Sequence, residues 1–337
     1  MSSGLVFGKF LPPHAGHVHL IRQALRQVDE LTVAVCTLER QPIDGALRAA
    51  WMRELFPEAN VVHVTDENPS EPHEHPRFWE IWCDTLRRAC GGELPETLFT
   101  SEDYGDELAR RLGIRHVLVD RDRHAVPISG TAIRAAPVRH WAQVPGPVRP
   151  YLLKRVVVTG PESTGKTTLA ARLADHYQTW FVPEFARGYL DEVNARRGTM
   201  TSICLEEDME PIARGQRTSE DEAADRADRL LILDTDLHVT RIFAEHYFQR
   251  CAPWIVEAAT SRPYDLHLLL DVDVPWVADA LRDQPHAREQ FLERFRSELA
   301  GRRVVEIRGG WEERFRRARE AIDQVLAEPM RPIHARP

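Results

Sequence analysis

The sequence has only five cysteines, and no two of them form a Cys-x-x-Cys pair. An odd number of scattered thiols is typical of a reduced protein and argues against a disulfide framework. The chain also lacks any run approaching the ~20 apolar residues that a membrane-spanning helix needs. Its short N-terminal apolar stretch is interrupted by Lys9, Pro12 and Pro13, so it does not read as a signal peptide. These absences predict a cytoplasmic protein without a membrane partner.

Positive charge is not in excess either. The formal net charge is −8 at pH 7, which argues against a large basic surface for nucleic acid but leaves room for a local phosphate pocket. The sequence shows no internal repeat and no low-complexity segment. At 337 residues the chain is about twice the length of a typical domain. Two domains are therefore expected.

Short apolar runs alternate with longer amphipathic stretches along the chain. This alternation predicts an α/β fold with two doubly wound parallel sheets, each covered by helices on both faces. We expect a first domain at residues 1–136, a linker at 137–153, where prolines cluster with Gly146, and a second domain at 154–330. Strands are expected at residues 5–10, 31–36, 61–65, 97–100, 116–119, 156–159, 180–183, 230–234, 266–271 and 303–306. Helices are expected at residues 18–29, 46–56, 78–90, 106–112, 166–176 and 311–326.

The first motif that indicates phosphate binding follows the first expected strand. Residues 8–17 read Gly-Lys-Phe-Leu-Pro-Pro-His-Ala-Gly-His, and the last of them open the next expected helix. Ligands of open α/β sheets bind at the carboxyl ends of strands, beside helix N-termini whose free N–H groups attract anions. Gly16 lets a nucleotide approach the backbone, and His14 and His17 can both donate hydrogen bonds to phosphate oxygens. Two such histidines in isolation would more simply be helix caps or surface residues.

A second part of this site lies at residues 128–134, which read Ile-Ser-Gly-Thr-Ala-Ile-Arg. Hydroxyls, backbone N–H groups and a guanidinium at the start of a helix can hold a polyphosphate chain. Such a site suits attack on the α-phosphate of ATP with loss of pyrophosphate. An attacking phosphate is already anionic, so this reaction needs charge neutralisation and no general base. The expected ATP-binding residues are Gly8, Lys9, Phe10, His14, Gly16, His17, Ser129, Thr131 and Arg134.

The second motif, at residues 160–167, has the P-loop pattern Gly-x-x-x-x-Gly-Lys-Thr between an expected strand and an expected helix. The N–H groups of the loop would cradle phosphates, and Lys166 would reach the β- and γ-phosphate oxygens. Thr167 would bind Mg²⁺, together with Asp234 at the end of an apolar strand. This pattern predicts transfer of the outermost phosphate of ATP.

Phosphorylation of an alcohol needs a proton acceptor near the nucleophile. Glu184 follows the strand expected at 180–183, so we expect it beside the P-loop, and its surroundings resemble the strand-end glutamate segment of deoxynucleoside kinases. It is the first candidate for the general base, and Asp236 is the rival. A surface pair of Glu184 with Arg187 is the alternative interpretation.

A segment at residues 280–288 resembles the arginine-bearing lid of small-molecule kinases. Arg282 and Arg288 would close on the transferring phosphoryl group, although Arg288 fits an exposed helix better. The expected ATP-binding residues of the second site are Gly160, Glu162, Ser163, Thr164, Gly165, Lys166, Thr167, Thr168 and Arg282.

Together the two parts of the first site resemble the nucleotidyltransferase superfamily, specifically the nicotinamide mononucleotide (NMN) adenylyltransferases. The resemblance implies that His17 stabilises the transition state and that His14 binds ATP phosphates. The segment at residues 75–79, followed by Trp82, resembles an aromatic platform for the nicotinamide ring. A cationic pyridinium is favourable over an indole face. Trp79 and Trp82, three residues apart, would equally suit the core side of a helix.

Such a domain joined to this P-loop domain resembles the NadR family of bifunctional NMN adenylyltransferases and ribosylnicotinamide kinases. The resemblance covers nearly the whole chain and includes the segments at 183–187, 234–236, 264–270 and 274–279. It implies a Rossmann-like nucleotidyltransferase domain followed by a P-loop kinase domain. Some members carry an N-terminal helix-turn-helix repressor domain. Here the first motif begins at Gly8, so we expect no transcriptional repression.

The resemblance implies two consecutive steps of NAD biosynthesis and salvage. The second domain would phosphorylate nicotinamide riboside with MgATP, and the first would join the resulting NMN to AMP from ATP, giving NAD and pyrophosphate. The expected ligands are thus ATP, nicotinamide riboside, NMN and NAD, with Mg²⁺ as cofactor and no nucleic acid; the sequence is compatible with a homo-oligomer. Two alternatives stay open: a related fusion enzyme for another nucleoside or nucleotide, and a nucleotide-sensing module without turnover.

Overall fold

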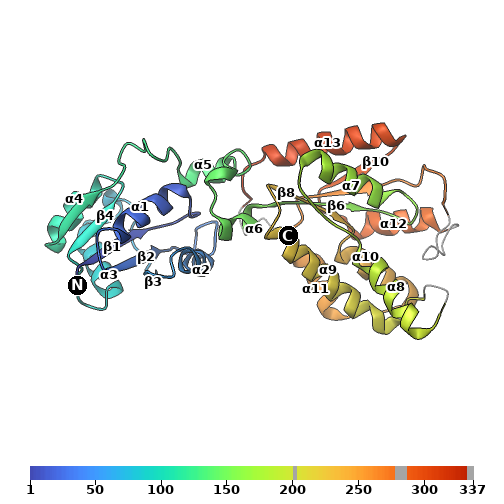
Figure 1. Cartoon of the computed structure of the whole chain (residues 1–337), viewed down its shortest axis with the longest axis horizontal. Helices are drawn as coiled ribbons and strands as arrows, with labels where there is room; N and C mark the ends of the chain where they lie inside the picture. The colour runs from blue at the N-terminus through green and yellow to red at the C-terminus, as the bar shows by residue number, and fades with distance from the viewer. Residues whose placement is uncertain (200–202, 278–286, 332–337) are drawn as a thin grey trace. The chain divides into compact units, whose positions relative to one another are not determined.

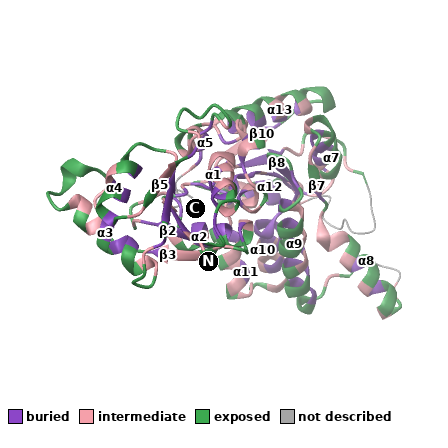
Figure 2. Ribbon diagram, turned by 60° about the vertical axis from the view of Figure 1, so that its left-hand side comes forward, coloured by how far each residue is buried: buried purple, intermediate pink, exposed green. Residues whose placement is uncertain are grey.

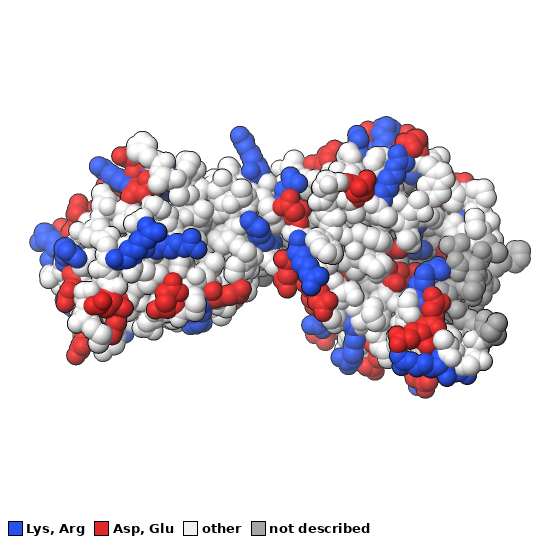
Figure 3. Space-filling view, viewed as in Figure 1, with Lys and Arg blue, Asp and Glu red and all other residues white. Residues whose placement is uncertain are grey.

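The computed structural model describes residues 1–199, 203–277 and 287–331. The chain forms two compact units, one of Met1–Arg149 with residues 329–331 and one from Pro150 to Glu328 (Figure 1). Each unit has its own five-stranded sheet in which every strand pair is parallel. The predicted α/β class with two parallel sheets is confirmed. On the face drawn in Figure 3, acidic and basic side chains are interspersed over each unit.

The first unit has the sheet order β3-β2-β1-β4-β5, so β1 is central and the order reverses between β1 and β4. Ligands of doubly wound sheets bind at this reversal. The strands are β1 (Ser3–Gly8), β2 (Glu30–Cys36), β3 (Asn60–Val64), β4 (Thr97–Thr100) and β5 (Arg115–Leu118). The helices are α1 (Ala15–Leu25), α2 (Gly45–Leu55), α3 (Phe78–Ala89), α4 (Tyr104–Leu112) and α5 (Gly130–Ala135), with a 3-10 turn, η1, at Pro72–Glu74.

Helices cover both faces of this first sheet (Figure 2), and its inner strands β2, β1 and β4 hold most of its buried residues. On one face Ile21 of α1 and Met52 of α2 pack against Val33 of β2. On the other, Leu86 of α3 and Leu108 of α4 lie in a second apolar cluster. Burying one such side chain stabilises the fold by roughly 1.5–3 kcal/mol. Near-continuous apolar strands are the pattern that a parallel sheet buried on both faces requires.

Most of the segment that we expected to be a linker, residues 137–153, belongs to the first unit, because the units divide between Arg149 and Pro150. It forms the turns η2 (Trp141–Gln143) and η3 (Gly146–Val148), followed by α6 (Arg149–Leu152). Trp141, Val144 and Val148 are buried. The prolines here produce tight turns, and the apolar residues between them pack into the unit.

The second unit has the sheet order β10-β9-β6-β8-β7. Its strands are β6 (Lys154–Thr159), β7 (Trp180–Val182), β8 (Leu230–Asp234), β9 (Leu266–Leu270) and β10 (Val304–Ile307). Its helices are α7 (Lys166–Tyr177), α8 (Phe185–Arg197), α9 (Met209–Ala224), α10 (Leu237–Phe248), α11 (Pro253–Ser261), α12 (Arg288–Glu298) and α13 (Trp311–Ala327), with a 3-10 turn, η4, at Glu206–Asp208. Helices α8 to α12 were not among the predicted elements.

The two faces of this second sheet pack against different helices. Leu268 of β9 lies in a cluster with α7 and α13, whereas Leu269 packs with α10 and α12. Successive side chains of a strand point to opposite faces, so β9 contributes to both cores. None of the helices in the described part of the chain is long and apolar enough to cross a membrane.

Two candidate nucleotide sites

A cavity of about 1040 Å³ lies in the first unit, at the carboxyl end of β1. It collects residues that follow β1 and β4 and residues that open α1, α3 and α5. Every site residue that the sequence predicted for this domain lines it: Gly8, Lys9, Phe10, His14, Gly16, His17, Trp79, Trp82, Ser129, Thr131 and Arg134. The topology thus places the two halves of the first motif around one space.

The two histidines at the start of α1 are held by the backbone that they cap. Nδ1 of His14 accepts the N–H of Gly16 at 3.2 Å, and Nδ1 of His17 accepts the N–H of His14 at 3.3 Å. Their rings stack with centroids 3.7 Å apart. Because each Nδ1 accepts a hydrogen bond, the proton of each neutral ring must lie on Nε2. Both residues therefore cap the helix and keep an N–H donor for a ligand.

Burial keeps both imidazoles neutral. Burial, together with the smaller effect of the nearby positive charge of Arg123, lowers the pKa of His14 to about 4. Burial, followed by the charges of His14 and Arg123, also lowers the pKa of His17 well below its usual value. A neutral Nε2–H can donate to a phosphate oxygen at any physiological pH.

This shift predicts a pH-dependent stability of the first unit. The unfolded chain takes up a proton on His14 below about pH 6.5, whereas the folded chain resists it down to about pH 4. The contribution of His14 to the free energy of unfolding is therefore complete above about pH 6.5. It falls as the pH drops toward 4, by at most about 3 kcal/mol. We expect the urea-unfolding free energy of wild type to fall more between pH 7 and pH 4.5 than that of His14→Asn, which keeps a capping oxygen. Equal pH dependence in both proteins would contradict the shifted pKa.

The segment that opens α5 is tied to the loop after β1. The hydroxyl of Ser129 accepts the N–H of Ala132 at 3.2 Å and so caps α5. Arg134 donates to the carbonyl of Leu11 and, at 3.1 Å, to the hydroxyl of Thr131. A Cβ at Gly130 would lie 2.5 Å from the Leu11 carbonyl oxygen, so only glycine permits this approach. The predicted phosphate-binding residues therefore also build the cavity.

Trp79 and Trp82 lie between the cavity and the core of the first unit. They line the cavity and also pack against the apolar cluster beneath α3. The indole N–H of Trp82 donates to the carbonyl of Pro69 at 2.9 Å, and its ring lies 5.6 Å from that of Phe7. Arg111 lies over Trp79, 5.6 Å from its centroid.

Sequence reasoning missed two further cations of this cavity. Arg40 and Arg123 both line it, and they supply positive charge that a polyphosphate requires. Arg123 has a positive φ of 53° in the short segment that precedes Ser129. The feature of the sequence that could have identified Arg123 was its position shortly before residues 128–134, the second part of this site.

A cavity of about 440 Å³ lies in the second unit, beside the P-loop between β6 and α7. The backbone of the loop requires its glycines. Gly160 has a φ of 137°, and a Cβ there would lie 2.8 Å from the carbonyl oxygen of Leu270. Gly165 has a φ of 86°, and a Cβ there would lie 2.3 Å from the ring of Trp311. The loop lines the cavity with Glu162, Ser163, Thr164, Gly165, Lys166, Thr167 and Thr168.

The residues expected at the metal lie together. The Thr167 hydroxyl, at the start of α7, donates to Oδ2 of Asp234, at the end of β8. Oδ1 of Asp234 is buried and has no hydrogen-bond partner among the described residues. Burial raises the pKa of Asp234 to about 6, and Lys166 opposes that shift while Glu184 adds to it. A carboxylate oxygen with an open position beside a hydroxyl fits the hard oxygen ligation that Mg²⁺ prefers.

The structure separates the two candidates for the general base. Glu184 lines the cavity beside the P-loop, although β8 lies between β6 and its own strand β7. Asp236 is buried and is not among the residues that line the cavity. Its Oδ1 accepts the N–H groups of His238 and Val239, which caps α10. This geometry favours Glu184 over Asp236 as the general base.

The expected lid lies partly outside the described residues, and Arg282 is among those that the structure does not describe. Arg288 begins α12 and donates to the carbonyls of Val274, at 3.0 Å, and of Ser163 in the P-loop, at 3.4 Å. The exposed-helix interpretation of Arg288 is therefore wrong, because its guanidinium is directed to the loop.

Sequence reasoning missed most of the wall opposite the P-loop, because it comes from helices that were not predicted. That wall is mainly apolar and aromatic, with a few polar groups. It consists of Arg187, Leu190, Met209, Ile212, Gln216, Val239, Phe243 and Tyr247, among others. Phe243 and Tyr247 stack at 6.0 Å on α10, and their i, i+4 spacing was the available signal.

Comparison with known proteins matches both halves of the chain. Residues 5–136 match the cytidylyltransferase-like family, and residues 155–314 match the AAA domain family. The trifunctional NAD biosynthesis/regulator protein NadR of Escherichia coli (strain K12) is 31% identical over 96% of this chain and 83% of its own length. The protein of that name from Salmonella typhimurium is 33% identical over 83% of this chain and 71% of its own.

The fold is also that of a solved relative. The crystal structure of a NadR protein in complex with NR has a TM-score of 0.81 to this chain at 24% identity, over 98% of this chain and 97% of the other. Both cavities, the two family matches and the near full-length similarity agree. The chain therefore belongs to the NadR family.

Proposed function

We propose that this chain makes NAD in two steps, as a ribosylnicotinamide kinase and an NMN adenylyltransferase. The observation that carries the proposal is the pair of separate phosphate cavities. One has neutral histidine donors at a helix N-terminus, and the other has a P-loop with a carboxylate beside it. These geometries support cleavage of ATP at different phosphates. NMN formed by the second unit is the substrate of the first.

In the first unit a phosphate oxygen of NMN attacks the α-phosphorus of ATP, and the bond from that phosphorus to pyrophosphate breaks. Negative charge builds up on the α-phosphate oxygens in the transition state. The Nε2–H groups of His14 and His17 are donors with a fixed orientation, and such donors stabilise developing charge without reorganising. Arg40 and Arg123 line the same cavity and add positive charge for the leaving pyrophosphate.

In the second unit the 5′ oxygen of nicotinamide riboside attacks the γ-phosphorus of ATP, and its proton passes to Glu184. Lys166 lies at the start of α7, where the helix N-terminus and the ammonium attract the β- and γ-phosphates. Thr167 and Asp234 would hold Mg²⁺, which neutralises charge on the phosphates when bound. The apolar wall with Phe243 and Tyr247 suits a nucleoside.

Glu184→Gln tests the proton acceptor. We expect kcat of the kinase reaction to fall about 10²-fold, because general bases typically contribute 10²–10⁴-fold. KM for ATP should change little, since the P-loop is intact. Glu192→Gln, on the exposed side of α8 where Glu192 pairs with Arg196, is the matched control and should retain full activity. An unchanged kcat in Glu184→Gln would show that another group takes the proton.

Incubation of the purified chain with MgATP and nicotinamide riboside tests the function as a whole. We expect NMN to appear first and NAD to follow, as measured by chromatography. Parallel reactions with uridine, cytidine and thymidine test the related fusion enzyme, and NMN with CTP tests the nucleotide donor. Absence of both products, with turnover of another nucleoside, would contradict the nicotinamide assignment. Binding of ATP without any product would favour the sensing module.

A further inference from the structure

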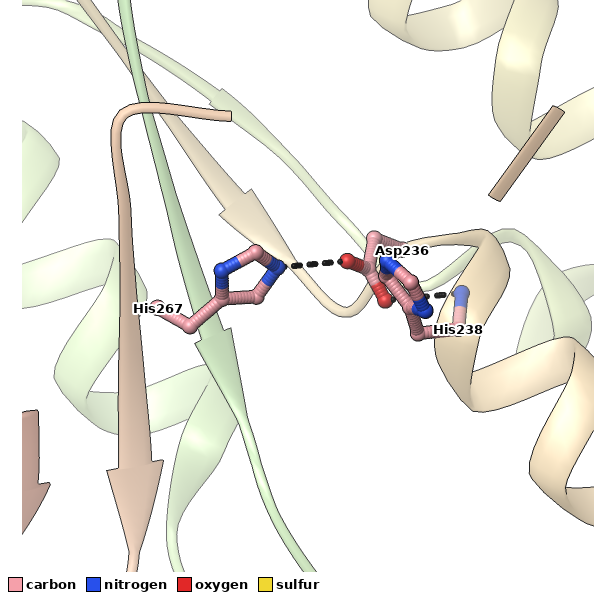
Figure 4. A group of neighbouring side chains, drawn as sticks. All are labelled: Asp236, His238 and His267. Atoms are coloured by element: carbon pink, nitrogen blue, oxygen red, sulfur yellow. Dashed lines mark hydrogen bonds and ion pairs between the residues drawn. The ribbon is translucent and has the colours of Figure 1, made fainter. Parts of the chain in front are cut away.

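A buried group of one aspartate and two histidines lies outside the residues that line the two cavities. Asp236 and His238 lie at the start of α10, and His267 lies on β9 (Figure 4). Each residue is 1% exposed. A carboxylate oxygen and one nitrogen from each ring lie within 4.8 Å of one another. His267 reaches this position because it shares the face of β9 with Leu269, which packs toward α10.

Glu298 of α12 orients His238 as a ligand. Its carboxylate lies 2.8 Å from Nδ1 of His238 and also accepts from Arg241 at 3.0 Å. Nδ1 must therefore carry the proton, and Nε2 must carry a lone pair. Nε2 is buried and has no hydrogen-bond partner among the described residues. A histidine that donates one ring N–H to a carboxylate and presents the other nitrogen is the usual arrangement at a metal.

Asp236 and His267 are already spaced as ligands of one ion. Oδ2 of Asp236 and Nε2 of His267 form a hydrogen bond of 3.0 Å, and a bound ion would replace its proton. Two donors bound tetrahedrally to Zn²⁺ at about 2.0–2.1 Å lie roughly 3.3 Å apart. The other carboxylate oxygen of Asp236 accepts two N–H groups of α10, which fixes its direction. Among the described residues Asp236 has no lysine or arginine in its ion pairs, only His267.

We propose that Asp236, His238 and His267 bind one divalent transition-metal ion, with Zn²⁺ as the best match. Imidazole nitrogens with one carboxylate suit Zn²⁺, whereas Mg²⁺ prefers oxygen ligands. The ion joins the carboxyl end of β8, the start of α10 and the middle of β9. It thereby holds the chain next to Thr235, which lines the kinase cavity. This site is distinct from the oxygen ligands Thr167 and Asp234.

The experiment uses the full chain without a histidine tag. The protein is stripped with a chelator, loaded with one equivalent of Zn²⁺, dialysed against metal-free buffer and measured by mass spectrometry. We expect about one retained zinc per chain in wild type and none in His238→Gln. Loading with Co²⁺ should give the intense absorption of a tetrahedral site in wild type only. Glu298→Gln should weaken zinc binding 10–100-fold through the orientation of His238.

Controls separate the site from other binding. His176→Asn changes a histidine elsewhere in the same unit, and Thr167→Ala removes a proposed Mg²⁺ ligand; both should retain zinc. Circular dichroism and a cooperative thermal unfolding transition of the second unit, in which His238 lies, check that His238→Gln is folded. No retained zinc in wild type, or equal zinc in wild type and a folded His238→Gln, would overturn the proposal. Zinc lost equally from Thr167→Ala and His238→Gln would assign it to the kinase site and also overturn the proposal.

Discussion

Lys166→Ala is expected to abolish formation of NMN from nicotinamide riboside while adenylation of supplied NMN continues. The Lys166 ammonium donates to the carbonyl of Pro161 at 3.0 Å and lies over the cavity that the P-loop lines. In the proposed reaction Lys166 is the cation that the γ-phosphate approaches, and a single cation at a transferring phosphoryl group is worth ~10³-fold or more. That corresponds to a barrier increase of about 4 kcal/mol. Product chromatography with each substrate supplied separately measures both activities.

The matched control is Arg172→Ala, which removes a cation from the exposed part of the same helix. Arg172 pairs with Glu312 at the surface, and exposed pairs are typically worth 0–1 kcal/mol. Its kinase activity should therefore equal that of wild type. If Lys166→Ala lost both activities while remaining folded, the two reactions would depend on one nucleotide site. That result would contradict the proposal that each unit catalyses one of the two reactions at its own site.

His17→Ala is expected to lower kcat for NAD formation from NMN and ATP by about 10²–10³-fold, the usual effect of losing one oriented transition-state donor. The loss should fall on kcat more than on KM for ATP, because charge develops on the α-phosphate only during the reaction. Kinase turnover in the same protein should be unchanged. Steady-state kinetics with NMN as the varied substrate gives the measurement.

His124→Ala controls for removal of a histidine from this unit. The side chain of His124 is exposed, and it does not line the cavity. Its adenylyl transfer should match that of wild type. Because the side chain of His17 also accepts the N–H of His14, His17→Asn provides a variant that keeps a capping acceptor. Full activity in His17→Asn would assign His17 a structural role only.

Local patterns were sufficient for the elements that contact phosphate. The P-loop and the segment from Gly8 to His17 each join a strand to a helix within a few residues, so their geometry follows from nearby chemistry. Gly160 and Gly165 show this directly, since their positive φ angles are required wherever that loop forms. The predicted strands and helices match the observed elements to within a few residues. The alternation of short apolar runs with longer amphipathic stretches made the two parallel sheets predictable as well.

The wall opposite the P-loop in the second cavity was not predictable from local patterns. Residues such as Gln216, Phe243 and Tyr247 come from helices α9 and α10, which lie far from the P-loop along the chain, so local spacing does not show that they share its cavity. Local patterns also could not decide between Glu184 and Asp236 as the general base. Both follow strands and both carry a carboxylate, and only the direction of each side chain in the folded unit distinguishes them.

The amino-acid sequence by itself determined the two phosphate motifs, the α/β class and the reaction types, because backbone conformation and residue chemistry over short stretches decide them. Only the tertiary structure decided which side chains share a cavity, which histidine nitrogens carry protons, and that Asp236 meets His238 and His267 in the core. Those properties depend on burial and on contacts between residues far apart along the chain. Such contacts cannot be inferred from the spacing of residues in the sequence unless the order of the strands in the sheet is known.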